Sequence, residues 1–226
     1  MQDETVHDEQ IRELERGATL HGPSPSPTQR SLAKAERRAA ILAASARLFA
    51  SAGFNGVSIE DLGAATGVSG PAIYRHFSSK QAVLAALLIG VSEDLVVGGQ
   101  AVVDTAPDAA TALRALVAFH VDFALSRPDV IRVQDRDLES LGEEDSHQVR
   151  TLQRRYVELW VGILGELNPH AETGLLRIRA HAVFGLMNST PYSTGFAAAT
   201  EDYRASESVR ALLEAMALGA LTVELD

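Results

Sequence analysis

The stretch Thr66–Lys80 reads TGVSGPAIYRHFSSK, and it decides how the rest of the chain is interpreted. It combines a turn, a proline, two aromatic rings and three potential cations within fifteen residues. The whole chain of 226 residues is acidic, with 20 Lys and Arg against 30 Asp and Glu and a net charge of −10. The net negative charge of the whole chain repels polyanions such as nucleic acids, but this short segment is suited to contacting one.

Charge is distributed unevenly along the sequence. Residues 30–80 carry seven basic and three acidic side chains, for a net charge of +4. Residues 1–29 have a net charge of −4, and residues 81–226 have a net charge of −10. A basic segment inside an acidic protein is a candidate contact surface for a nucleic acid.

Composition excludes several kinds of site. The chain has no cysteine, which excludes disulfides, thiolate metal sites and cysteine nucleophiles. The first ten residues, MQDETVHDEQ, are acidic where a secretory signal begins with positive charge. No apolar run approaches the roughly 20 residues that cross a bilayer. We therefore expect a soluble, cytoplasmic protein with no membrane partner, no metal site and no cofactor.

Apolar residues recur at helical spacing from Ser31 onward, and strand-like alternation is absent. This pattern predicts an all-α protein. The first 30 residues include the Pro/Ser-rich stretch HGPSPSPTQ, which predicts a disordered arm. The expected organisation is an arm at 1–30, a DNA-binding domain at 31–84 and a helical domain at 85–226.

Two short helices are expected at 58–65 and 69–76, with Thr66-Gly67-Val68 as a tight turn between them. Gly67 can take a positive φ at the end of the first helix. Capping boxes are expected at Ser58 with Asp61 and at Ser78 with Gln81. The spacing predicts a helix-turn-helix, whose second helix lies in the DNA major groove.

The exposed face of the second helix is suited to a duplex. Tyr74, His76 and Lys80 can donate to phosphates, and Arg75 is long enough to reach a base edge. The alternative readings are a core aromatic at Tyr74, an exposed histidine without a role at His76 and a solvated lysine at the helix start at Lys80. Arg37 belongs to a basic run at 30–38 that is either an arm on the DNA or an ordinary charged face. The residues expected to contact DNA on these grounds are Arg37, Ser69, Gly70, Pro71, Ala72, Tyr74, Arg75, His76 and Lys80.

Residues 37–84, above all SIEDLGAATGVSGPAIYRHFSSKQAVL, resemble the DNA-binding domain of the TetR/AcrR family of bacterial transcriptional regulators. The shared residues are Phe49, Gly53, Phe54, Ser58, Tyr74, His76, Phe77 and Lys80. The resemblance implies that Ser58, Tyr74, His76 and Lys80 hold phosphates. The segment departs from the family pattern at Gly70-Pro71-Ala72, where many members carry a bulkier or polar residue.

The resemblance also implies that residues 85–226 dimerise and bind a small molecule. The last two helices, at about 172–189 and 201–221, would form a four-helix bundle with a second subunit. The residues expected at that dimer interface are Leu176, Ala180, Val183, Leu212, Leu213, Met216 and Leu221. A homodimer would present two heads to the half-sites of a palindromic operator.

The ligand site is expected among aromatic and polar groups on the middle helices, although ordinary core is the alternative reading of the same residues. The candidates are Phe119, His120, Phe123, Trp160, Phe184, Asn188 and Tyr192. The stretch FGLMNSTPYST resembles regulators of fatty-acid and acyl-CoA metabolism. Arg132, Arg136, Arg154 and Arg155 could meet an anionic ligand or form surface ion pairs.

The predicted function is a ligand-responsive transcriptional regulator, a homodimeric repressor that a small molecule releases from its operator. Two alternatives are a helical enzyme and a protein-interaction module. No G-x-S-x-G, Walker loop, dinucleotide fingerprint or H-E-x-x-H occurs, and the seven histidines show no i, i+4 pairing. We therefore predict that the chain is not an enzyme.

Overall fold

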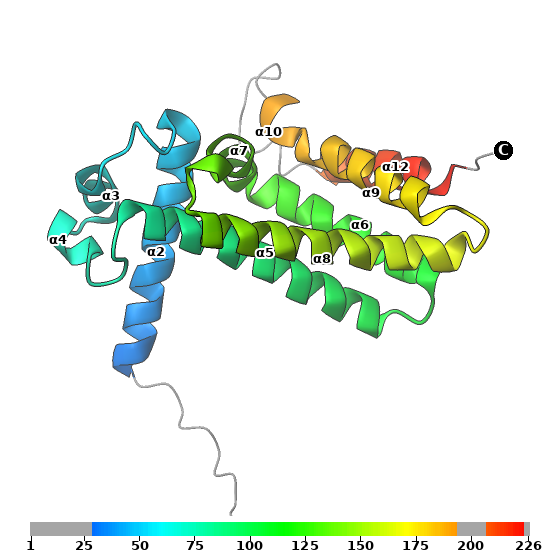
Figure 1. Cartoon of the computed structure of the whole chain (residues 1–226), viewed down its shortest axis with the longest axis horizontal. Helices are drawn as coiled ribbons and strands as arrows, with labels where there is room; N and C mark the ends of the chain where they lie inside the picture. The colour runs from blue at the N-terminus through cyan, green and yellow to red at the C-terminus, as the bar shows by residue number, and fades with distance from the viewer. Residues whose placement is uncertain (1–28, 194–206, 224–226) are drawn as a thin grey trace, which may run out of the picture. The chain divides into compact units, whose positions relative to one another are not determined.

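The computed structural model describes residues 29–193 and 207–223, and every regular element in these ranges is helical (Figure 1). The α-helices are α2 (Gln29–Ala52), α3 (Ile59–Thr66), α4 (Gly70–Ile73), α5 (Lys80–Thr105), α6 (Ala109–Ser126), α7 (Pro128–Asp137), α8 (Glu143–Leu167), α9 (Thr173–Asn188), α10 (Thr190–Ser193) and α12 (Glu207–Thr222). A 3-10 turn, η1 (Leu138–Ser140), follows α7. The all-α prediction is confirmed.

The chain divides into two compact units, Met1–Arg37 and Arg38–Asp226. In the first unit the structure describes residues 29–37, which are helical and exposed. The predicted arm at 1–30 otherwise lies outside the described residues. Within the second unit we call residues 38–84 the head, and residues 85–193 with 207–223 the body.

Local sequence accounts for α3 and for the turn after it. Ser58 Oγ accepts a hydrogen bond from the Asp61 N–H at 3.1 Å, and the Ser58 N–H donates to Asp61 Oδ2 at 2.8 Å. The Ser58 hydroxyl also donates to this carboxylate, and these bonds lower the pKa of Asp61. Gly67 ends the helix with a φ of 67°, in the left-handed region. The predicted capping box and turn are confirmed.

The next two helices differ from the prediction, α4 in its length and α5 in the residue that caps it. The segment expected to be helical over 69–76 forms α4 only over Gly70–Ile73, followed by turns. Ser69 stands at the N-cap of α4, but its side chain makes no capping hydrogen bond. The cap of α5 is Ser79, whose Oγ accepts from the Ala82 N–H at 3.0 Å, so the predicted box at Ser78 was wrong by one residue.

Two apolar cores stabilise the second unit. The first is centred on the head, where α2, α3, α4 and the start of α5 bury Phe49, Leu62, Ile73 and Leu84; α7 and the start of α8 close it. The second lies in the body among α6, α8, α9 and α12. Each such side chain contributes roughly 1.5–3 kcal/mol on burial. Helix α5 joins the cores, and Leu95 packs against both.

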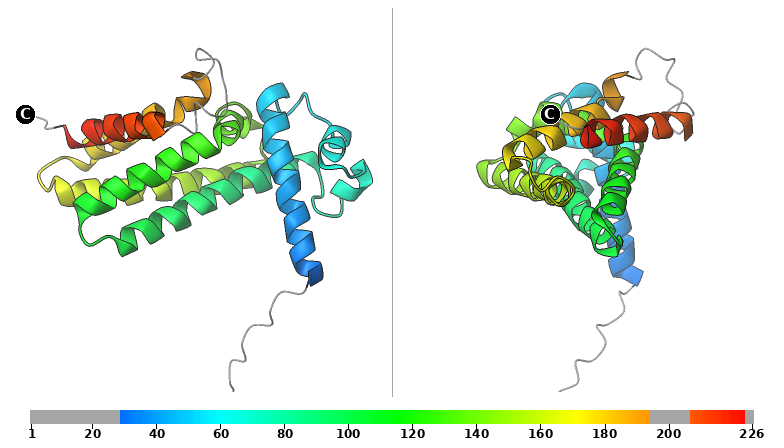
Figure 2. Two further views of the ribbon diagram at one scale, coloured as in Figure 1. Left: turned by 180° about the vertical axis from the view of Figure 1, so that it is seen from behind. Right: turned by 90° about the vertical axis from the view of Figure 1, so that its right-hand side faces the viewer.

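The helices of the body lie side by side, with α5, α6 and α8 in contact (Figure 2). Helix α9 packs on α6, α8 and α12, and α12 packs on α6. Close packing of α5 on α8 requires a glycine, because a Cβ at Gly99 would lie 2.7 Å from Tyr156 Cε2. The predicted boundary between residues 84 and 85 falls inside α5, which is continuous.

Two helices, α5 and α6, are long and apolar enough to cross a membrane by length and composition alone. The expectation that no segment approaches this length was therefore wrong. Both helices supply side chains to the cores of the second unit, and this accounts for their composition.

Candidate nucleic-acid interface and ligand cavity

The segment from α4 into the following turns has one buried and one exposed face. Ile73 and Phe77 are buried in the first core, whereas Tyr74 is 55% exposed and Arg75 is also exposed. The alternative reading of Tyr74 as a core aromatic is therefore excluded. A short amphipathic segment of this kind can dock on a duplex through its outer face without disturbing the core.

The other predicted DNA contacts differ in their exposure to solvent. Ser58, Ser69 and Pro71 are exposed, and Gly70, Ala72 and His76 are half-buried. Arg37 is exposed in the first unit. Its neighbour Arg38 belongs to the second unit and places its guanidinium 4.8 Å from the centre of the Phe77 ring.

The Lys80 side chain is turned toward the loop between α2 and α3. Its ammonium donates to the carbonyl oxygens of Phe54 at 2.8 Å and Val57 at 2.7 Å, and it lies 4.4 Å from the centre of the Phe54 ring. These bonds hold the loop between α2 and α3 against the start of α5. A lysine has three N–H donors, so one remains for another acceptor. Phosphate contact by Lys80 stays a prediction, and this geometry gives the residue a structural role as well.

His76 has a buried nitrogen. Its Nδ1 atom has no hydrogen-bond partner among the described residues. A buried N–H without a partner is costly, so the tautomer with hydrogen on Nε2 is favoured. That tautomer keeps a donor for an acceptor outside the head.

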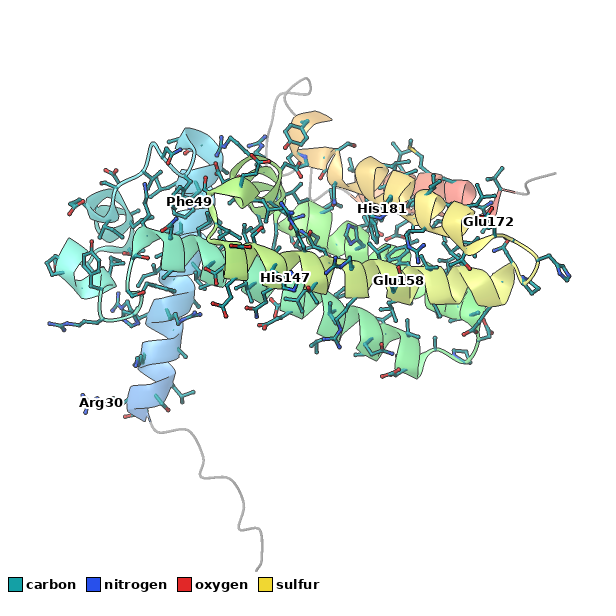
Figure 3. The ribbon with its side chains drawn as sticks, in the orientation of Figure 1. Arg30, Phe49, His147, Glu158, Glu172 and His181 are labelled. Carbon is teal, nitrogen blue, oxygen red and sulfur yellow. The ribbon has the colours of Figure 1, made fainter. Side chains whose placement is uncertain are left out.

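The second candidate site is a cavity of about 210 Å³ in the body, which we call the His120 cavity. Five helices contribute to its wall. The lining residues are Ser92, Leu95, His120, Phe123, Ile131, Gln134, Gln153, Tyr156, Val157, His181, Phe184 and Asn188. His181, labelled on α9 in Figure 3, is exposed.

His120 is the polar centre of this cavity. Its Nδ1 lies 3.3 Å from Tyr156 Oη, and its Nε2 lies 3.1 Å from Asn188 Oδ1. With this orientation of the amide, Nε2–H donates to Asn188 while Nδ1 accepts from the Tyr156 hydroxyl. Burial lowers the pKa of His120 from 6.5 to about 4, so the imidazole is neutral at pH 7. Burial also raises the pKa of Tyr156.

Aromatic rings surround the imidazole. The centre of the His120 ring lies 4.9 Å from that of Phe184 and 5.6 Å from that of Phe123. Trp160 stands behind them, fully buried, with its ring centre 5.0 Å from that of Phe184. Around His120 the cavity therefore has flat aromatic walls, and the imidazole is a neutral hydrogen-bonded group.

Four of the seven predicted ligand residues line the cavity, namely His120, Phe123, Phe184 and Asn188. Three others do not. Phe119 packs against Gly98, and Trp160 lies in the core behind the wall. Tyr192 is 56% exposed and donates to Asp135 Oδ2 at 2.8 Å.

Sequence reasoning missed the other eight lining residues, which are Ser92, Leu95, Ile131, Gln134, Gln153, Tyr156, Val157 and His181. A signal existed for Gln153, which lies on the buried stripe of α8 between Val149 and Tyr156, where a polar side chain is unusual. No comparable signal marks Gln134 or His181. Their roles follow only from how α7 and α9 pack.

The predicted anion-binding arginines do not reach the cavity. Arg132 donates to the carbonyl oxygen of Pro191, and Arg154 donates to Thr151 Oγ1 at 3.1 Å. Arg136 donates to the carbonyl oxygens of Phe49 and Ala50 (at 3.3 Å to Ala50). Arg155 is exposed on α8.

Arg136 links the body to the head. Phe49, labelled in Figure 3, belongs to the last turn of α2, which contains no basic residue of its own. A cation at a helix C-terminus is favourable, since the unpaired carbonyls there carry partial negative charge. Arg136 also pairs with the buried Asp137 at 3.1 Å. Its helix, α7, thus holds the end of α2.

The predicted dimer surface on α9 needs correction. Leu176, Ala180 and Val183 are buried within the subunit, as is Leu221 on α12. The outward apolar side chains of α9 are Leu175 and Ile178, the latter 66% exposed. On α12, Leu212 and Met216 are exposed and Leu213 is half-buried. Helix α9 therefore carries apolar side chains on two sides, and the side predicted to form the dimer interface is packed inside the subunit.

Residues 41–87 match the family described as "Bacterial regulatory proteins, tetR family", and residues 106–192 match "Tetracyclin repressor-like, C-terminal domain". The HTH-type transcriptional repressor KstR2 of Rhodococcus jostii is 28% identical over 142 residues, which cover 62% of this chain and 70% of KstR2. The HTH-type transcriptional activator FasR of Mycolicibacterium smegmatis is 34% identical over 92 residues, which cover 41% of this chain and 42% of FasR.

Solved structures share the fold. A TetR-family transcriptional regulator from Bordetella parapertussis has a TM-score of 0.72 at 24% identity and covers 82% of this chain and 94% of its own. FadR of Bacillus subtilis, in complex with stearoyl-CoA, has a TM-score of 0.62 at 16% identity over 81% of this chain and 97% of its own. The chain is a DNA-binding transcriptional regulator rather than an enzyme, and it belongs to the TetR family.

Proposed function

We propose that this chain acts as a homodimeric repressor and that a small molecule in the His120 cavity releases it from a palindromic operator. The observation that carries this proposal is the position of α7. Ile131 and Gln134 on α7 line the cavity, and Arg136 on the same helix donates to the end of α2 in the head. A ligand that displaces α7 therefore acts on an element of the DNA-binding part.

DNA contact is assigned to the outer face of the head. Arg75 reads a base edge, and Tyr74 and the Nε2–H of His76 donate to phosphates. Ser58, Ser69 and the Gly70-Pro71-Ala72 segment are assigned to the same contact, and DNA contact by Arg37, which belongs to the first unit, is proposed separately. Support comes from the exposure of Tyr74 and Arg75 directly opposite the buried Ile73 and Phe77.

Dimerisation is assigned to the exposed apolar side chains of α9 and α12. Leu175, Ile178, Leu212 and Met216 would be covered by the same helices of a second subunit. Burying this set offsets part of the entropic cost of association. Two heads then face the half-sites of one operator, spaced by about one helical turn of DNA.

Regulation follows as a shift between two conformations. The ligand favours a conformation in which the paired recognition segments no longer match successive grooves, and it does so by the difference in its affinity for the two states. The cytoplasm is the expected location for such a protein.

The DNA assignment is tested by gel shift with the duplex upstream of the chain's own coding region. We expect Arg75→Ala to weaken operator binding by roughly tenfold or more, as loss of a base contact requires. Arg155→Ala removes the same charge from an exposed site on α8 and should leave affinity within about twofold of the native value, allowing for its small long-range contribution. Equal effects of the two variants would refute the assignment.

The dimer assignment is tested by sedimentation. Ile178→Glu places a charge in the assigned surface and should yield monomers that lose operator affinity. Val97→Glu changes an exposed apolar residue on α5 and serves as the control. A dimer that survives Ile178→Glu would show that another surface pairs the subunits.

A further inference from the structure

We infer that the His120 cavity takes an uncharged molecule of one or two rings that carries hydroxyl or carbonyl groups. The inference rests on the proposed function, because it names the chemical class of the effector. It departs from the fatty-acid or acyl-CoA class expected from the sequence. Charge, volume, wall shape and free hydrogen-bonding groups support it independently.

Charge comes first. The lining residues that the structure describes include neither Lys nor Arg, nor Asp or Glu. The nearby Arg132 and Arg136 are engaged with backbone carbonyls outside the cavity. His120 is neutral and gives both ring nitrogens to Tyr156 and Asn188. His181, the other histidine of the lining, is exposed. A carboxylate or phosphate beside His120 would therefore lose its hydration without gaining a buried counter-ion, which is costly.

Volume limits the size of the molecule. The cavity measures about 210 Å³. An apolar cavity of roughly 150 Å³ accommodates benzene, and pockets for drug-sized ligands begin at about 300 Å³. The His120 cavity lies between these values. One or two rings fit, whereas a long acyl chain with a nucleotide head does not.

The walls favour a flat molecule. Phe123, Tyr156 and Phe184 surround the imidazole of His120, and the Tyr156 and Phe184 rings are stacked with centres 5.7 Å apart. Aromatic pairs prefer offset or edge arrangements at such separations. A planar ring system can join this cluster with little rearrangement.

Three carboxamides supply the hydrogen bonds. Asn188 uses Oδ1 on His120, and its NH₂ group has no partner among the described residues. The side chains of Gln134 and Gln153 have no hydrogen-bond partner within the described part of the chain. A carboxamide offers both a donor and an acceptor. Neutral hydroxyl and carbonyl groups satisfy both without adding charge.

An adjoining hollow could hold a larger, charged ligand. Gln134 and Gln153 also line this outer hollow, where Arg136 and Arg150 lie with Asp135 and Glu139. Its two cations are balanced by two carboxylates, so it offers no net positive charge. An acyl-CoA placed across both spaces would depend on Arg150, and this distinguishes the two classes.

The test is calorimetric titration of the full chain at pH 7 with four probes: β-naphthol, β-naphthoate, naphthalene and octanoyl-CoA. We expect β-naphthol to bind at least tenfold more tightly than β-naphthoate or naphthalene. Tighter binding of β-naphthoate, or octanoyl-CoA binding that Arg150→Ala abolishes, would overturn the inference. Absence of β-naphthol binding to the folded chain would overturn it too.

A matched pair of variants tests the hydrogen bonds. Gln134→Leu should weaken β-naphthol binding about tenfold and leave naphthalene binding unchanged, because only the hydrogen bond is lost. Gln100→Leu makes the same exchange at an exposed position of α5 outside the cavity and should change neither. Parallel losses for both probes in Gln134→Leu would indicate a merely structural role and contradict the assignment.

Operator binding is measured on the same samples to separate the two proposals. A chain that shifts operator DNA but fails the probe series retains the proposed function and loses this inference. A chain that binds β-naphthol but does not shift its upstream DNA retains the cavity assignment and loses the proposed function.

Discussion

The head and the His120 cavity present their functional side chains in opposite ways. In the head, Tyr74 and Arg75 point outward from a short segment whose other face is core. In the cavity, side chains from five helices point inward, from Ser92 to Asn188. The first arrangement is local in sequence and the second is not. The contrast shows why a DNA-binding motif can be recognised from a sequence, whereas the residues of a ligand site are harder to predict.

Acid stability distinguishes the two regions most strongly. The pKa of His120 is depressed in the folded protein, so the unfolded chain binds a proton first as the pH falls. Its contribution to stability is present above pH 6.5 and is lost progressively down to about pH 4. A shift from 6.5 to about 4 corresponds to about 3 kcal/mol. Urea unfolding at several pH values should show this loss.

The His120→Phe variant should flatten that dependence between pH 6.5 and 4. His147→Gln changes an exposed histidine on α8 and is the control. Carboxylates with lowered pKa, such as Asp61 and Asp108, act in a lower window, as the pH falls through their folded values. An unaltered slope in His120→Phe would mean that the acid response does not originate in the cavity.

Two glycines in α5, one near each region, differ in the space around them. Gly99→Ala forces a Cβ to within 2.7 Å of the Tyr156 ring, and we expect a loss of roughly 1–3 kcal/mol from overpacking. Gly90→Ala meets no atom within 4 Å and should gain about 0.5–1 kcal/mol from helix propensity. Thermal unfolding measures both. Equal shifts for the two variants would refute the close approach of α5 and α8.

The link between the regions is tested at Arg136. The Phe49 carbonyl accepts from the Gly53 N–H at 2.8 Å and from Arg136. Removing a charged donor costs about 1.5 kcal/mol or more, so Arg136→Ala should speed exchange of the Gly53 amide hydrogen roughly tenfold. NMR hydrogen exchange reports this directly. Arg154→Ala, whose partner Thr151 lies in its own helix, should leave Gly53 unchanged.

The smallest effects are expected at the caps of the head. Ser58→Ala removes a capping hydrogen bond and should destabilise the protein by about 1 kcal/mol. Ser69→Ala should cost almost nothing in stability, since the Ser69 side chain makes no capping bond. Chemical denaturation compares them. A larger loss for Ser69→Ala would show that α4 is capped differently from this structure.

Much of the head followed from sequence because its signals are local. Ser58 and Asp61 are three residues apart, and Gly67 follows directly on the helix it ends. Errors arose where neighbouring residues compete, as with Ser78 and Ser79, since either hydroxyl could cap α5. Lys80 was expected to contact DNA or solvent, and its bonds to Phe54 and Val57 were missed, because sequence does not reveal carbonyl oxygens 23 and 26 residues away.

The body was less predictable because its contacts are remote. His120 and Asn188 were expected near a ligand, but their hydrogen bond spans 68 residues and required the structure. The two apolar faces of α9 differ by one residue in phase, so composition could not separate the buried Leu176 from the exposed Leu175. The helical period of a sequence identifies the apolar faces of a helix. Only the packing of the folded chain shows which other helix each face contacts.

Helix α5 runs unbroken from the head into the wall of the cavity. Each residue of an α-helix advances the next by about 100° around the axis. Inserting a single residue near Gly90 would therefore turn Ser92 and Leu95 away from the cavity while the segment before it stayed in place. A chimera that joins the head of one such regulator to the body of another must therefore keep the number of residues in α5, so that the residues after the junction keep their rotation about the helix axis. A flexible linker between the two parts would not impose this requirement.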